Sequence, residues 1–380
     1  MFDKSDIRAA VEAGAISDEA AKRFEGFLKA RNDPDRMLDP ENLRFLSNFN
    51  DVFLTIGIAV LMTGLAFLSG IAAWNIFGVE AITRGVDSVP SQSAINTVKL
   101  AMVVTPIPVI VGAWLLAEYF CGKRRLLLPS MALSLAIVAA SAVFMTALLV
   151  PTNVDDVNRI SGNVGNYISS ISYGGFGAAA VAAGAIFWRF RLPFSLFLLA
   201  LSAAGLFYTL VGNSLGLDQI FSGAVMLGAG VATLICAIAF DMRDPQRSTR
   251  TADHAFWLHM AAAPQIILGV RGLILGSGFA PASMQDATAM LVVLLAFAVL
   301  SLGLNRRALI VSGLLSFATA LWVLVDRVGG GGVNTLMLTA LIVGGAIVLL
   351  GGGWRTARRA LLKLIPSAGV TGRIFPPEPA

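Results

Sequence analysis

The residues that could carry chemistry gather in one apolar stretch, residues 253–275, which reads DHAFWLHMAAAPQIILGVRGLIL. It holds both histidines of the chain, His254 and His259, together with Gln265 and Arg271. Histidine can exchange a proton or bind a metal near neutral pH, and arginine can bind a carboxylate or a phosphate. Such side chains are costly inside a hydrocarbon layer, so each of them is a candidate for function.

Helical spacing places these side chains on different faces. His254 and Gln265 are eleven residues apart and share one face, whereas His259 lies on another. Two histidines spaced by five residues, without a third ligand, are poorly shaped to hold a metal. We therefore expect no metal and no cofactor, and we expect both histidines to join Trp257 in an interfacial belt.

Arg271 has two interpretations. It lies five residues before Gly276, hence about 7 Å from the outer edge of its span. From that depth the side chain can extend to the lipid headgroups or make a structural hydrogen bond. Alternatively, it lines an outward-facing cavity and holds an anionic group such as a carboxylate or a lipid phosphate.

Glu118 is the remaining candidate for an intramembrane polar site. It lies three residues before Cys121, near the inner end of its span, and we expect it to pair with Lys123 or Arg125. No expected span carries a central carboxylate, and no Walker loop, GxSxG, HExxH or Cys/His cluster occurs. The sequence therefore predicts no catalytic residues and no enzyme.

Apolar blocks of about twenty residues must position all of these side chains. Hydrophobic residues make up 56% of the 380 residues and charged residues 13%, far from the roughly 25% charged residues of a soluble domain. The sequence predicts an all-α fold, a polytopic transmembrane helical bundle of about ten spans. The expected spans are 52–77, 100–121, 127–150, 171–188, 192–212, 219–240, 254–276, 285–304, 308–328 and 333–354.

The basic residues predict the orientation. With both termini in the cytoplasm, the inside segments hold 23 of the 28 lysines and arginines, and the outside loops hold four. Cytoplasmic loops carry such an excess, so we expect a multi-pass membrane protein with both termini inside. The net charge of +5 follows from this placement and does not indicate nucleic-acid binding.

Four parts follow along the chain. Residues 1–35 are expected to form a cytosolic helical hairpin, in which Gly14 ends the first helix and Ser17 caps the second. Residues 36–51 form an amphipathic interfacial lead-in that begins at Asp39 and Pro40. The transmembrane bundle covers 52–354, and 355–380 form a cytosolic basic tail.

Glycines and prolines inside the spans predict how the helices pack. Pro106 and Pro108 should kink the second span, because proline lacks a backbone N–H. Glycines in the fourth, sixth and tenth spans should let helix backbones approach closely, or act as hinges. The glycines concerned are Gly174, Gly175, Gly177, Gly184, Gly223, Gly228, Gly230, Gly344, Gly345 and Gly351–Gly353.

Two short motifs, VEAGAISDEAAKRF at 11–24 and AFWLHMAAAP at 255–264, resemble those of uncharacterised bacterial polytopic membrane proteins that are classed only as a domain of unknown function. The layout, a short helical region followed by a lead-in and many spans, is similar as well. The resemblance implies an inner-membrane location. It implies no assigned activity and no catalytic residues.

Two functions remain open from the sequence. The first is a transporter-like protein for a small solute or a lipid, because ten spans and an intramembrane arginine allow a central pathway. The second is a non-catalytic membrane scaffold or sensor that acts through its N-terminal cytosolic helices. The expected partners are the lipid bilayer, a protein bound at residues 1–35, and a second copy of the chain.

Overall fold

The computed structural model describes residues 11–14, 16–21, 23–24, 49–79, 91–150, 164–215, 219–244, 250–275, 283–329, 332–363 and 375. The chain divides into two compact units, Met1–Arg44 and Phe45–Ala380. Asp39 and Pro40, the expected start of the lead-in, lie outside the described residues.

In the first unit, the two expected helix signals are present. Gly14 has a φ of 69°, and its N–H donates to the carbonyl of Val11 at 2.9 Å, which ends the first helical turn. The hydroxyl of Ser17 accepts from the N–H of Ala20 at 3.2 Å, as an N-cap does. Both predictions are confirmed.

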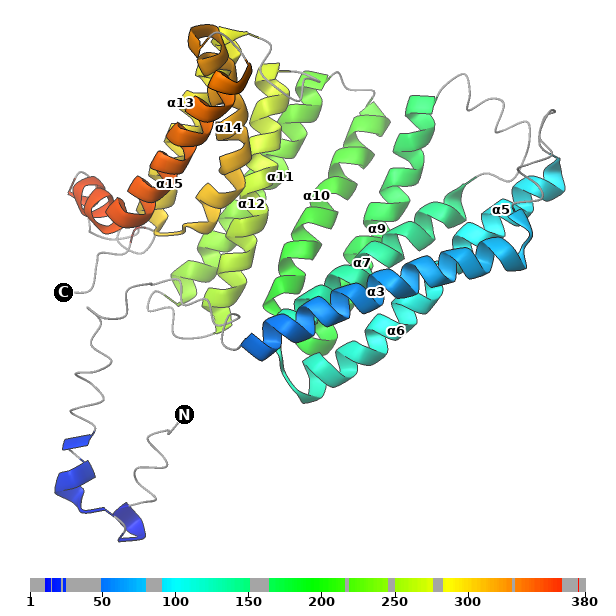
Figure 1. The fold of residues 1–380 in the computed structure, drawn as a ribbon, viewed down its shortest axis with the longest axis horizontal. Coiled ribbons are helices and arrows are strands. Elements are labelled where there is room, and N and C mark those ends of the chain that lie inside the picture. The colour runs from blue at the N-terminus through cyan, green and yellow to red at the C-terminus, as the bar shows by residue number, and fades with distance from the viewer. Residues whose placement is uncertain are drawn as a thin grey trace. The chain divides into compact units, whose positions relative to one another are not determined.

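Most of the described residues of the second unit are helical, and no strand occurs among them. Figure 1 shows the helices in chain order. They are α3 (Phe49–Ile76), α5 (Gln92–Val104), α6 (Ile107–Ala117), the π-helix η1 (Glu118–Lys123), α7 (Leu127–Leu149), α9 (Val164–Phe190), α10 (Pro193–Leu215), α11 (Gln219–Arg243), α12 (Arg250–Leu275), α13 (Met284–Leu304), α14 (Ala308–Gly329) and α15 (Gly332–Leu362).

This arrangement confirms an all-α polytopic membrane bundle. Within the described residues, nine helical segments are long and apolar enough to cross a membrane. They match every expected span except 308–328, which the structure forms as the 22-residue helix α14.

Several boundaries differ from those expected. The second span begins at Gln92 rather than near residue 100, because the hydroxyl of Ser91 accepts from the N–H of Ala94 and caps α5. The kink at Pro106 is confirmed, since α5 ends at Val104 and α6 begins at Ile107. The last helix continues to Leu362, so the first part of the expected basic tail belongs to α15.

Helix α12 packs against four other helices, α10, α11, α13 and α14. Its alanines at 255, 261, 262 and 263 are fully buried, and their small side chains let the surrounding helices approach. Long stretches of α3 and α15, in contrast, expose large apolar side chains, as expected where helices face lipid. The candidate stretch 253–275 is therefore closely surrounded by other helices.

The tight-packing prediction for glycines holds for Gly223 and Gly230 of α11 and is wrong for Gly228, where an added Cβ would meet nothing within 4 Å. A Cβ added at Gly223 would lie 2.8 Å from the carbonyl carbon of Gly272, and one added at Gly230 would lie 2.7 Å from the N of Ile266. Helices α11 and α12 are thus in backbone contact. The same prediction is wrong for α15, where a Cβ at any of its five predicted glycines would meet nothing within 4 Å.

Three tight turns join neighbouring helices, and each contains one non-glycine residue in the left-handed conformation. Arg125, Arg191 and Asn305 have φ values of 54°, 52° and 54°. A left-handed residue commonly ends a helix, and asparagine tolerates that conformation better than arginine does. We call the end of the membrane domain that holds these three turns the elbow end.

Contacts between side chains join this end of the bundle. His254 lies between the rings of Phe187, just before the second elbow, and Phe240 near the end of α11. Asp241, the residue after Phe240, accepts hydrogen bonds from Arg306 in the third elbow.

Candidate functional site

A buried ionic cluster lies where α11, α12 and the third elbow meet. Arg306 donates from Nε to Oδ2 of Asp241 at 3.2 Å, and a second nitrogen of its guanidinium donates to Oδ1. The Arg306 side chain is 3% exposed and that of Asp241 is 15% exposed. A two-pronged pair of this kind fixes both the distance and the orientation of the two groups.

His259 completes the cluster from α12. It is fully buried, with Nδ1 2.8 Å from the carbonyl oxygen of Ala255 and Nε2 3.7 Å from Oδ2 of Asp241. If Nδ1 donates to that carbonyl, Nε2 is the ring nitrogen that faces the carboxylate of Asp241.

The third elbow positions Arg306. Asn305 turns the chain in the left-handed conformation, and the hydroxyl of Ser301 donates to the carbonyl oxygen of Arg306 at 2.5 Å. These two restraints hold the arginine backbone next to the end of α13. Its side chain extends to Asp241 of α11, the carboxylate that also lies near His259 of α12.

The same elbow reaches α15. Trp354 is 3% exposed, and its Nε1 donates to Oδ1 of Asn305 at 2.9 Å. The guanidinium carbon of Arg307 lies 5.4 Å from the centroid of the Trp354 ring, within the range of a cation–π contact. The elbow thus directs Arg306 into the bundle and places Arg307 over the Trp354 ring of α15.

Gln265 has a structural position among three helices. Its Oε1 accepts from the hydroxyl of Thr233 on α11 at 3.1 Å, and its Nε2 donates to the carbonyl of Ala200 on α10 at 3.5 Å. It is 2% exposed, so these hydrogen bonds satisfy an amide that would otherwise be costly to bury. Gln265 joins helices and does not face the ionic cluster.

Glu118 pairs with a residue that the sequence did not suggest. Its carboxylate accepts from Nε and from the terminal nitrogen of Arg189 on α9 at 3.0 and 2.7 Å, instead of pairing with Lys123 or Arg125. The Arg189 and Glu118 side chains are 53% and 35% exposed, so this pair lies at the surface of the bundle.

Arg271 lies far from the histidines. It is half-buried, and it makes no ion pair or hydrogen bond with any residue that the structure describes. Twelve residues of helix separate it from His259, a rise of about 18 Å. The candidate residues of α12 therefore belong to different places, and only His259 lies in the ionic cluster.

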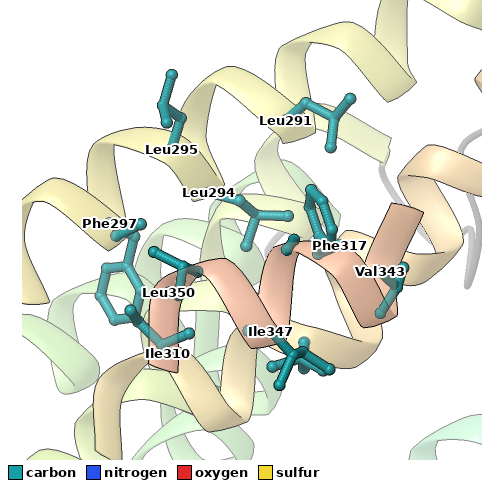
Figure 2. A pocket seen from close by; sticks show the side chains of 13 residues that line it. Leu291, Leu294, Leu295, Phe297, Ile310, Phe317, Val343, Ile347 and Leu350 are labelled. Atoms are coloured by element: carbon teal, nitrogen blue, oxygen red, sulfur yellow. The ribbon is translucent and has the colours of Figure 1, made fainter. Parts of the chain in front are cut away.

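An apolar groove forms the second candidate site, between α13, α14 and α15 (Figure 2). Its volume is about 380 Å³, within the range of ligand pockets, and every residue that lines it is apolar or glycine. The lining residues are Leu291, Leu294, Leu295, Phe297, Ala298, Ile310, Gly313, Leu314, Phe317, Val343, Ala346, Ile347 and Leu350.

The groove has a buried floor and an open edge. Leu294 and Phe297 are each 8% exposed and belong to the core cluster around Ile267 of α12. Leu295 and Ile347, on α13 and α15, are 67% and 46% exposed. A molecule in the surrounding hydrocarbon can reach the groove from the side.

Asp241 and Arg306 could not be recognised as partners from the sequence, because 65 positions separate them. The sequence offers one indication of this cluster: Asp241 and Arg306 carry opposite charges in two inside turns, and a histidine lies in the apolar segment that becomes α12. Among the described residues, no group of three histidine, cysteine or acidic side chains could hold a metal ion.

No protein-family model, no curated protein and no solved structure matches this chain.

Proposed function

We propose that this multi-pass protein resides in the bacterial inner membrane with both termini in the cytoplasm, and that it handles lipids in a transporter-like manner. The observation that carries the proposal is the groove between α13, α14 and α15, which is apolar throughout and open at one edge. A polar solute would leave its hydrogen-bonding groups unsatisfied there. The hydrocarbon part of a lipid would not.

The position of the groove supports a lipid over a water-soluble apolar molecule. All of its lining residues lie within helices α13, α14 and α15, and two of these helices are apolar and long enough to cross a membrane. The open edge lies between Leu295 and Ile347, and α15 buries little of its surface. Entry from the bilayer needs no aqueous path.

A matched pair of alanines on α13 tests the groove. Ala298 is half-buried and lines it, whereas Ala296 is exposed and does not line it. Ala298→Phe should fill the groove, and Ala296→Phe should add the same ring to the outer surface. The protein is reconstituted in vesicles that contain a phospholipid with a photoreactive acyl chain, and the labelled peptides are mapped.

Labelling is expected on α13, α14 and α15 of the original protein and of Ala296→Phe, with most of it lost in Ala298→Phe. Movement of a fluorescent phospholipid between leaflets is measured on the same vesicles and should follow the labelling. Equal labelling of the two variants would contradict a lipid in the groove. Labelling without leaflet exchange would contradict transport and leave a lipid-binding protein.

A scaffold or sensor role is the second candidate, and one observation favours it. Residues Met1–Arg44 form a compact unit separate from the membrane domain. Deletion of residues 1–35 distinguishes the two functions, because leaflet exchange should persist in a transporter that lacks this unit. Loss of a cellular phenotype with exchange intact would instead support binding of a protein partner.

A further inference from the structure

A buried threonine, Thr339 of α15, lies next to one end of the apolar groove. Val343 lines the groove at this end (Figure 2). Thr339 precedes Val343 by four residues and follows Thr335 by four, so the three side chains lie on one face of α15. The hydroxyl of Thr335 donates to Oδ1 of Asp326 on α14 at 3.1 Å. Thr339 therefore lies between that hydrogen bond and the groove.

The hydroxyl of Thr339 is buried, and it has no hydrogen-bond partner among the residues that the structure describes. The residue is 6% exposed. Other buried hydroxyls of the bundle are satisfied by their own helices, since Ser134, Ser202 and Thr209 each donate to the carbonyl four residues earlier, at 2.7–3.0 Å. A buried hydroxyl without a partner is destabilising. Thr339 thus offers a donor that a bound molecule can engage.

Charged side chains near this end of the groove disfavour an anionic partner. Asp326 lies near the end of α14, and Asp286 lies in the first turn of α13. Arg327 is the only basic residue in the described parts of these helix ends. A carboxylate or a phosphate beside Thr339 would be repelled by the two acidic groups, and its burial would be costly. The acceptor that suits Thr339 is therefore an uncharged oxygen.

The depth of Thr339 matches that of lipid ester groups. It lies seven residues after Gly332, where α15 begins, which is about 10 Å along the helix axis. The headgroup layer takes about 6 Å on each side of a bilayer, so a helix that begins at the membrane surface places Thr339 just inside the hydrocarbon. Ester carbonyls join the acyl chains of a phospholipid to its headgroup at this boundary. They are uncharged, and a carbonyl oxygen accepts hydrogen bonds.

The dimensions of the groove suit a single acyl chain. Its volume of about 380 Å³ is near the small end of the range for ligand pockets. From Val343 to Leu350 it follows seven residues of α15, a length of about 10 Å that leads away from Thr339. A chain whose ester group lies at the Thr339 hydroxyl would extend directly into the groove.

We propose that Thr339 donates a hydrogen bond to the ester carbonyl of a phospholipid whose acyl chain lies in the groove between α13, α14 and α15. This inference rests on the proposed lipid-handling function and adds the chemical group that the protein recognises. With both termini in the cytoplasm, α15 begins at the outer face of the membrane, so the lipid belongs to the outer leaflet.

The experiment compares two photoreactive phosphatidylcholines with identical hydrocarbon chains, joined through ester bonds in one and through ether bonds in the other. The protein is reconstituted in phosphatidylcholine vesicles that contain either lipid. The ester lipid should label the groove about fivefold more than the ether lipid, as one hydrogen bond predicts. Thr339→Val, which replaces the hydroxyl by a methyl group, should reduce this preference to near equality. Thr339→Ser keeps the hydroxyl and should retain the preference.

Thr335→Val is the matched control, because Thr335 is fully buried one turn away on the same face and its hydroxyl already donates to Asp326. It should keep the full preference for the ester lipid. Equal labelling by the two lipids in the original protein, a preference that survives Thr339→Val, or equal losses in the two valine variants would overturn the assignment of Thr339 while leaving the groove occupied. Absence of groove labelling by either lipid would instead refute the proposed function. If Thr339→Val does not fold, Thr339→Ala removes the same hydroxyl and decides.

Discussion

Asp241 and Arg306, separated by 65 residues in the chain, form a mostly buried two-pronged ion pair that joins the end of α11 to the elbow between α13 and α14. His259 of α12 lies 3.7 Å from the same carboxylate. Four helices therefore meet at one carboxyl group. The elbow that this pair holds is also the elbow that presents Arg307 to α15.

Asp241→Asn should destabilise the membrane domain strongly. The substitution leaves the Arg306 guanidinium buried without its counter-ion, a loss of about 3–5 kcal/mol. Thermal unfolding of the purified protein in detergent measures it as a lower midpoint. Glu118→Gln is the control, because the Glu118–Arg189 pair is much more exposed and such pairs contribute about 1 kcal/mol or less. Similar midpoints for the two variants would show that burial does not govern the Asp241 pair.

Gly269→Ala should destabilise the α11–α12 contact. A Cβ at Gly269 would lie 2.4 Å from the backbone N of Leu227, so the two helices would have to move apart, at a cost of about 1–3 kcal/mol. Gly345→Ala on α15 is the matched control, since its Cβ would meet nothing within 4 Å. Alanine favours helix there by up to about 1 kcal/mol. An unchanged unfolding midpoint for Gly269→Ala would argue against backbone contact between α11 and α12.

The helices could be predicted from the sequence because each is a local pattern of apolar residues bounded by polar or basic turns. The break at Pro106 is local as well, and the sequence predicts it. The partners of charged residues were not predictable in this way. Glu118 pairs with Arg189, which is 71 positions away in the sequence, and not with the nearer Lys123 or Arg125.

Glycines show the same limit. The composition of α11 and α15 is similar in small residues, and close packing was expected for both. Only tertiary contact distinguishes them, because Gly223 faces the backbone of α12 whereas Gly345 faces open space. Likewise, His259 belongs to a cluster because Asp241 and Arg306 reach it from other helices. A single sequence does not show which residues of different helices lie together.

Arg271→Gln should leave the stability nearly unchanged, within about 0.5 kcal/mol. Arg271 makes no ion pair or hydrogen bond with the described residues, so its removal leaves no known partner unsatisfied. The unfolding midpoint and the leaflet exchange of the variant are both measured. A midpoint as low as that of Asp241→Asn would assign Arg271 a structural partner. Normal stability with lost exchange would place it on the lipid path.

The orientation predicts which side of the membrane each end of α15 faces. In a variant with Cys121 and Cys236 replaced by alanine, single cysteines are introduced at Val333, an exposed residue at the start of α15, and at Ala360, an exposed residue near its end. A membrane-impermeant thiol reagent applied to intact cells should label the first and not the second.

Reporters fused to the two termini should both be cytoplasmic, because an even number of crossings returns the chain to its starting side. Termini on opposite sides would mean that one of the ten helices does not cross. Labelling of both cysteines from outside would identify α15 as a helix that fails to do so.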